Sequence, residues 1–221
     1  MGVRVPPPAL RAAATSGANP CQTAAVTTSR LEAFSDGVLA IIITIMVLEL
    51  HVPDGTDLEA LSASVTGFLT YALSFVYVGI YWNNHHHMFQ LVQRIDGLVL
   101  WTNMHLLFWL SLFPFTTAWM DESEFARTPV VIYGLNLLAA AVAYYLTQLA
   151  VFRSDGPGSP LRRAVGRDVK GKISPGLYLA GIAVAWLSPW LSLAIFTAVA
   201  VMWVVPDRRL ERFVAEHAGE Q

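Results

Sequence analysis

Residues 30–50 read RLEAFSDGVLAIIITIMVLEL, an apolar segment with polar and charged side chains in its first turns. These are Arg30, Glu32, Ser35 and Asp36, and Glu49 lies near the far end. A helix of about 20 apolar residues can cross a bilayer, whose hydrocarbon core is about 30 Å thick. Ionisable groups are unfavourable inside such a helix, so their presence indicates a functional or interhelical role.

The composition extends this interpretation to the whole chain. Of 221 residues, 55% are hydrophobic and 14% are charged, which is typical of a membrane protein. The apolar runs are continuous, whereas strands of a membrane barrel alternate, so helices are favoured. The net charge of −2 gives no indication of a nucleic-acid partner, and the single cysteine, Cys21, excludes an intrachain disulfide.

The apolar runs predict an all-α polytopic membrane protein. We expect six membrane-spanning helices, at residues 31–50, 61–82, 98–120, 129–152, 173–188 and 190–205. The second continues as a polar segment to His87. Pro114 predicts a kink in the third, because proline has no amide N–H for the helical ladder.

The last two spans have about 16 residues each, slightly short for a bilayer, and could be one long helix broken at Pro189. Loop charge favours two helices, because Lys and Arg collect in cytoplasmic loops. With six spans and both termini cytoplasmic, every basic residue except Arg127 lies on the cytoplasmic side. Five spans would place the basic cluster 208–212 outside. We therefore predict a multi-pass protein of the cell membrane.

Three regions follow from this organisation. Residues 1–29 are rich in Ala, Pro, Thr and Ser and lack the apolar stretch of a signal peptide, so we expect a disordered cytoplasmic tail. Residues 30–205 form the transmembrane domain. Residues 206–221 form a short cytoplasmic tail.

The first span has two chemically different faces. At about 100° per residue, Ile41, Ile45 and Leu48 fall on one face, with Thr44 beside them. Asp36 lies about 140° away by the same count. The apolar face could be ordinary packing against lipid or protein. Alternatively, several copies of it could line a narrow pore, because hydrophobic constrictions gate by dewetting.

The end of the second span supplies polar partners for Asp36. Residues 82–87 read WNNHHH, and Asn103 and His105 lie in the third span. A buried carboxylate needs hydrogen-bond donors, so an interhelical network is expected here. Consecutive histidines on a helix point about 100° apart and converge poorly on one ion, so we predict no metal. A histidine-based pH switch stays an alternative.

Enzyme signatures are absent from the sequence, which has no HExxH, GxSxG, Walker A or cysteine-pair motif. We therefore predict no enzyme activity and no cofactor. Two alternatives to a channel stay open. One is a proton- or cation-coupled secondary transporter with Asp36, Glu49 and the histidines 85–87 as relay groups. The other is a membrane enzyme with a metal at those histidines.

Several motifs resemble those of the transmembrane protein 175 family of potassium channels. RxxxFSDGV at 30–38, AIxxT at 40–44 and LEL at 48–50 are similar to the family's first-helix signature. YWNNHH at 81–86 is similar to its WxxHH segment, and LFPFT at 112–116 to its third helix. The resemblance covers most of residues 30–120. His87 departs from it, since many members have Arg there.

The resemblance implies a homotetramer of six-span subunits in the lipid bilayer, with the first helix of each lining a central potassium-conducting pore. It implies that Ile41, Ile45 and Leu48 form the constriction, with Ile41 nearest the cytoplasm as the leading gate residue. It implies a selectivity role for Thr44. It also implies a packing network that comprises Arg30, Phe34, Ser35, Asp36, Trp82, His85 and His86.

Overall fold

The computed structural model describes residues 28–166 and 168–204, and all regular structure in these residues is helical. The prediction of an all-α fold is confirmed. The helices are α1 (Thr28–Leu48), α2 (Leu58–Ala63), α3 (Val65–Gln90), α4 (Gly97–Ser111), α5 (Phe113–Glu122), α6 (Arg127–Asp155), α7 (Pro160–Val165), α8 (Val169–Val184) and α9 (Pro189–Val204).

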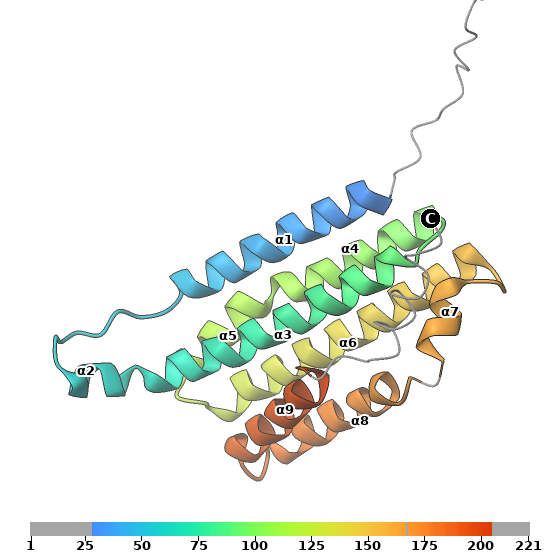
Figure 1. Cartoon of the computed structure of the whole chain (residues 1–221). Helices are drawn as coiled ribbons and strands as arrows, with labels where there is room; N and C mark the ends of the chain where they lie inside the picture. Colours follow the sequence, from blue (N-terminus) through green and yellow to red (C-terminus); the bar gives the residue numbers. More distant parts are fainter. Residues whose placement is uncertain (1–27, 167, 205–221) are drawn as a thin grey trace, which may run out of the picture.

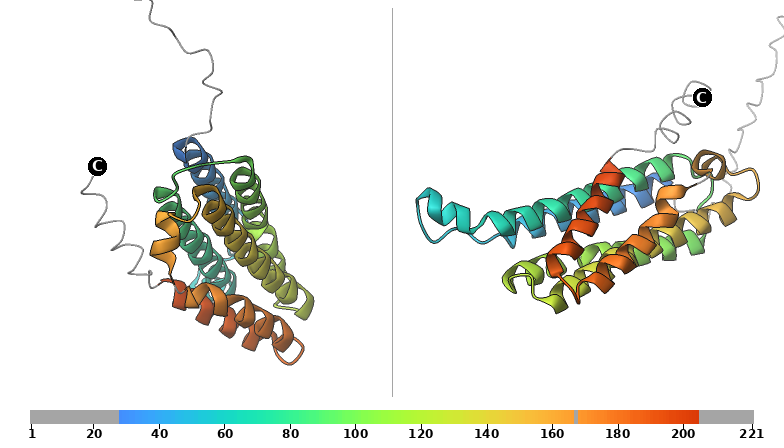
Figure 2. Two further views of the ribbon diagram at one scale, coloured as in Figure 1. Left: turned by 90° about the vertical axis from the view of Figure 1, so that its right-hand side faces the viewer. Right: turned by 90° about the horizontal axis from the view of Figure 1, so that it is seen from below.

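The long helices α1, α3 and α6 run side by side with the α4–α5 pair (Figure 1). Helix α1 packs against α3, α4 and α5, while α6 packs against α4, α5 and α8. Helices α8 and α9 form a hairpin on one side of this bundle, and α9 reaches back to α3 (Figure 2). Helix α1 therefore lies at an edge of the subunit, with one side covered.

Four helical segments are long and apolar enough to cross a membrane. They are Thr28–Leu48, Val65–Gln90, Gly97–Glu122 and Arg127–Asp155, which correspond to the first four predicted spans. Helices α8 and α9 have 16 residues each and are separated by a turn at residues 185–188. Their role as a fifth and sixth span stays a prediction.

The predicted boundaries differ slightly from the observed ones. Helix α1 begins at Thr28, so the last two residues of the predicted N-terminal tail are helical. The remainder of that tail, residues 1–27, lies outside the described residues, as do 205–221, which include the predicted C-terminal tail.

The predicted third span is interrupted at Leu112, between α4 and α5. Pro114 occupies the first turn of α5, where its missing N–H is tolerated because that position has no intrahelical acceptor. At the other end of α4, the Asp96 carboxylate accepts a hydrogen bond from the Val99 amide at 2.9 Å and caps the helix. The sequence thus fixes both ends of α4 with local chemistry.

The loop between α3 and α4 is tied to the end of α6. Asp155 Oδ1 accepts hydrogen bonds from the backbone amides of Gln93 and Arg94, at 3.1 and 3.0 Å. Ser154 Oγ donates to the Arg94 carbonyl at 3.2 Å. These contacts hold the ends of three helices in a fixed relation beside the start of α1.

Small residues let α6 and α8 approach the buried ring of Phe196 in α9. A Cβ at Gly134 of α6 would lie 2.6 Å from Phe196 Cζ and 2.8 Å from Ile182 Cγ1, and a Cβ at Gly181 of α8 would also meet the Phe196 ring. The hairpin of α8 and α9 is therefore packed on α6 too closely for a larger residue at either position.

Gly134→Ala is expected to destabilise the subunit by about 1–3 kcal/mol, because an extra methyl group in a filled core forces neighbouring side chains to shift. For a chain of this size, each kcal/mol corresponds to about 2–4 °C in melting temperature. Thermal unfolding in detergent measures the effect. Gly79→Ala is the matched control, since a Cβ there has no neighbour within 4 Å. Equal melting temperatures for the two variants would contradict the packing argument.

Candidate functional site

One face of α1 is buried within the subunit. Its buried residues recur at spacings of three and four and are Leu31, Ser35, Leu39, Ile42 and Met46. This spacing places them along one stripe of the helix, which packs against α3, α4 and α5. No described residue packs over the opposite side of α1.

The predicted apolar stripe lies on this uncovered side. Ile41 is 59% exposed, Ile45 41%, Leu48 79%, and Phe34, toward the helix start, 49%. Thr44 is exposed beside them, and its hydroxyl donates to the Ile41 carbonyl at 2.8 Å. A membrane-length helix with bulky apolar side chains on a free face can contact lipid, another subunit or the interior of a pore.

A buried polar chain joins α1, α4 and α3. Asn103 Nδ2 donates to Ser35 Oγ at 3.0 Å, and Ser35 Oγ donates to the Leu31 carbonyl at 2.9 Å. His85 Nε2 lies 2.8 Å from Asn103 Oδ1. Because an amide oxygen only accepts, His85 donates from Nε2, and its buried Nδ1 has no hydrogen-bond partner among the described residues. The three side chains specify how these helices meet.

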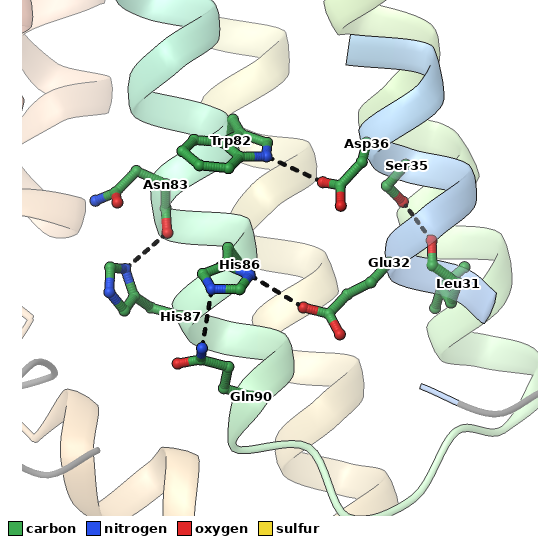
Figure 3. Close-up of polar contacts among 9 residues, drawn as sticks. All are labelled: Leu31, Glu32, Ser35, Asp36, Trp82, Asn83, His86, His87 and Gln90. Atoms are coloured by element: carbon green, nitrogen blue, oxygen red, sulfur yellow. Dashed lines mark hydrogen bonds and ion pairs between the residues drawn. The ribbon is translucent and has the colours of Figure 1, made fainter. Parts of the chain in front are cut away.

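A second set of contacts joins α1 to α3 (Figure 3). Trp82 Nε1 donates to Asp36 Oδ1 at 3.0 Å, and His86 Nδ1 lies 3.3 Å from Glu32 Oε1. Gln90 Nε2 donates to His86 Nε2 at 2.9 Å, which leaves Nδ1 as the proton-bearing nitrogen toward Glu32. The rings of Trp82 and His86 are stacked, with centroids 6.0 Å apart. Two carboxylates of α1 are thus held by neighbouring turns of α3.

Five of the seven residues predicted for the packing network meet in these contacts: Ser35, Asp36, Trp82, His85 and His86. Phe34 instead lies on the exposed side of α1. Arg30 is exposed, and its side chain forms no ion pair or hydrogen bond with another described residue.

The network also contains residues without a predicted role. Glu32 precedes Asp36 by four residues, a spacing that puts both on one helix face and is the signal that identifies it. Gln90 follows His86 by four residues for the same reason. Of the two candidate partners in the third span, Asn103 joins the network, while His105 accepts from Trp109 Nε1 on its own helix at 2.9 Å.

The three consecutive histidines have three different partners. His85 contacts Asn103, His86 contacts Glu32, and His87 Nδ1 lies 2.8 Å from the Asn83 carbonyl. Within residues 28–166 and 168–204, no group of three or more His, Cys, Asp or Glu side chains is arranged to hold a metal ion. The arrangement supports interhelical packing at this end of the bundle.

Comparisons with known proteins agree with the motifs and the fold. The family model described as "Endosomal/lysosomal potassium channel TMEM175" matches residues 30–114. A potassium channel of Chryseobacterium sp. (strain P1-3) is 48% identical over 192 residues, covering 87% of this chain and 100% of that protein. The human endosomal/lysosomal proton channel TMEM175 is 37% identical over 112 residues, covering 45% of this chain and 22% of the human protein.

A solved structure extends the match beyond the motifs. The crystal structure of a lysosomal potassium-selective channel TMEM175 homolog from Chamaesiphon minutus superimposes with a TM-score of 0.69 and 33% identity, covering 80% of this chain and 96% of that one. The resemblance recognised in the sequence is confirmed by the family model, the bacterial relative and this structure. The chain belongs to the TMEM175 family.

Proposed function

We propose that this protein is a potassium channel in which α1 from each of four identical subunits lines a central pore. The observation that carries the proposal is the exposed apolar stripe of Ile41, Ile45 and Leu48 on a helix whose other side is buried in its own subunit. One helix face cannot enclose a pore, whereas the same face repeated about a symmetry axis can. Membership of a family whose bacterial relatives are named potassium channels supports the proposal.

The constriction is assigned to Ile41, Ile45 and Leu48, with Ile41 as the principal gate. A narrow ring of isoleucine side chains offers no oxygen ligands to replace the hydration shell of an ion. When the ring contracts, it loses its water and blocks ions without closing completely. Small changes in the separation of the α1 helices would therefore open or close the pore.

The polar contacts of Ser35 and Asp36 set the rotation of α1 about its own axis. Ser35 is anchored through Asn103, and Asp36 through Trp82. Because successive residues differ by about 100° around a helix, a rotation by one residue would turn the isoleucines away from the axis. The charged motif acts on the pore by orienting the apolar face.

Both termini are assigned to the cytoplasm and the protein to the cell membrane, with α8 and α9 as the fifth and sixth spans. Described basic residues cluster in and beside the α3–α4 and α6–α8 connections and include Arg94, Arg153, Arg162, Arg163, Lys170 and Lys172, whereas Arg127 lies at the other end. Acidic residues gather at the other end, namely Asp54, Asp57, Glu59, Asp121, Glu122 and Glu124. This asymmetry supports the orientation, because cytoplasmic loops accumulate Lys and Arg.

Thr44→Ala is expected to lower the potassium-to-sodium permeability ratio roughly threefold or more, because it removes the only hydroxyl in the stripe that can replace water around an ion. Thr44→Ser is the matched control and is expected to keep the ratio, since it retains that oxygen. Reversal potentials under bi-ionic conditions measure both. An unchanged ratio in Thr44→Ala would remove Thr44 from the selectivity assignment.

Flux measurements on the purified protein in liposomes test the proposed function. A potassium gradient should drive potassium uptake that does not saturate like a carrier, with smaller sodium uptake. A parallel proton-flux measurement is included because the human relative is named a proton channel. Saturable flux at fixed stoichiometry would instead favour a coupled transporter. Absence of potassium flux at every voltage and pH would overturn the proposal, and the particle mass in detergent tests the tetramer.

A further inference from the structure

An apolar groove runs along the outside of the bundle between α3 and α9, away from the exposed side of α1. It has a volume of about 590 Å³ and is open on one side. Leu69, Leu73 and Val76 form the α3 wall, and Ala194 and Val201 belong to the α9 wall. These residues lie in apolar helices of the transmembrane domain, so the groove faces the hydrocarbon of the bilayer.

A polar recess of about 480 Å³ continues the groove at its acidic end. Groove and recess share Thr66, Phe125 and Trp190 as lining residues. The rings of Phe125 and Trp190 lie 4.7 Å apart and form the boundary between the two parts. Tryptophan is favoured at the interface between hydrocarbon and headgroups, so this boundary marks that level in the membrane.

The recess is negatively charged. Asp121 and Glu124 line it together with His51, which interacts electrostatically with the Asp121 carboxylate, and none of its described lining residues is Lys or Arg. The Asp121 carboxylate lies against the backbone of α3 at Gly67, where a Cβ would come within 2.5 Å of Oδ2. This carboxylate accepts no hydrogen bond from another described residue. An incompletely paired carboxylate beside an apolar groove is suited to bind a cation.

Glu124 lies in a backbone conformation that glycine adopts readily. Two backbone hydrogen bonds close the end of helix α5. The Phe125 amide donates to the Met120 carbonyl at 3.0 Å, and the Glu124 amide donates to the Asp121 carbonyl at 2.9 Å. In this Schellman ending, Glu124 has a φ of 50° at the position that glycine usually occupies. A glutamate is unfavourable in this conformation, so replacing Glu124 by glycine is compatible with the local backbone.

We propose that the groove and recess bind a membrane phospholipid with an ammonium headgroup, such as phosphatidylethanolamine. An acyl chain occupies the groove between α3 and α9, and the headgroup amine donates hydrogen bonds to Asp121 and Glu124. His51, Ser64 and Thr66 line the same recess and supply donors for the lipid phosphate. One lipid therefore satisfies the apolar, anionic and donor surfaces together.

A second copy of the chain fits this surface less well. Subunits of a symmetric membrane assembly share one orientation, so their acidic ends lie at the same level. In a ring of four, a neighbouring copy would present a different face at the same level, where its own acidic residues, at 54–59 and 121–124, gather, and like charges at an interface are unfavourable. An ammonium-bearing lipid has the opposite charge.

Native mass spectrometry of the delipidated full chain tests the proposal after incubation with phosphatidylethanolamine or phosphatidylglycerol. We expect phosphatidylethanolamine to bind about tenfold more tightly, as one charge-assisted hydrogen bond suffices for that ratio. Equal retention of both lipids would overturn the proposal. The readout requires no ion conduction, so it stands apart from the test of the proposed function.

Two variants separate the headgroup from the acyl chain. Glu124→Gly removes the carboxylate and introduces the residue favoured at that backbone position, so the chain should fold at least as well while the preference for phosphatidylethanolamine falls about tenfold. Ala194→Phe fills the groove from an exposed position of α9 and should reduce retention of both lipids. Unchanged lipid binding in either variant contradicts the assignment.

Two further measurements complete the test. Glu122→Gln is the matched control, because it removes a carboxylate from the same turn of α5 that lines a different recess, beside Glu49, and lipid binding should not change. Thr197→Cys in a Cys21→Ser background tests for a second copy, since Thr197 lines the groove. Efficient cross-linking between subunits at that position would show the groove to be an interface and overturn the lipid proposal.

Discussion

Ile41→Asn is expected to raise the permeability of the proposed channel to sodium, relative to potassium, by about tenfold, and to increase its closed-state leak. An amide at the narrowest ring keeps water in the pore, so partly hydrated ions of either kind can pass. Ile41 is 59% exposed in the subunit, so the substitution leaves the subunit core intact. Bi-ionic reversal potentials and single-channel recordings in planar bilayers measure the change.

The control for this prediction is Val47→Asn. Val47 is also exposed on α1, at 46%, but lies about 120° around the helix from Ile41. Val47→Asn introduces the same amide outside the proposed pore stripe, so we expect the potassium-to-sodium permeability ratio to stay unchanged. If both variants behave alike, or if Ile41→Asn conducts as the unsubstituted protein does, Ile41 is not the narrow point.

The second large effect is expected at Asn103. Asn103→Leu should lower the stability of the subunit by about 1–3 kcal/mol, because the buried His85 then loses the partner of Nε2 in addition to its unpaired Nδ1. For a chain of this length the melting temperature falls by about 2–4 °C per kcal/mol. Potassium flux should fall as well, because Ser35 loses its contact with α4 and the orientation of α1 then depends on the Asp36–Trp82 and Glu32–His86 contacts.

A double substitution tests whether the contact itself is responsible. His85→Phe combined with Asn103→Leu replaces both polar partners by apolar groups, which is less destabilising than leaving one of them unpaired. We expect the double variant to be more stable than the sum of the two single effects predicts. Strict additivity, measured by thermal unfolding in detergent, would mean that His85 and Asn103 act independently.

The hydrophobic pattern predicted the four long spans and the two faces of α1. Continuous apolar runs identify helices because a bilayer requires every backbone group to be paired within the segment. The spacing of Ile41, Ile45 and Leu48 fixes their common face, since it follows from helix geometry alone. The break near Pro114 follows equally from a local cause, the missing amide.

Contacts between helices were less predictable. The pairing of Glu32 with His86 depends on how far α1 and α3 slide past each other, and a single sequence carries no measure of that register. Phe34 differs, because it precedes Ile41 by seven residues and helix spacing alone places it on the exposed face, whereas the resemblance implied a place in the packing network. Helices α2 and α7 have six residues each, too short for a periodic pattern to reveal.

The interruption at Leu112 has a mechanical consequence. Helix α1 packs against both α4 and α5, and these meet where the helical ladder is broken. At this junction the Leu112 amide donates to the Trp109 carbonyl at 3.3 Å and the Thr116 amide to the Leu112 carbonyl at 3.0 Å. Pro114 has no amide to donate, so the ladder is incomplete and bends more easily there. Helices α4 and α5, which both pack against α1, are therefore two rigid segments joined at a flexible position. In the proposed channel, tilting of α5 would widen the pore near Ile45 and Leu48, while α4, which contacts Ser35, keeps its place.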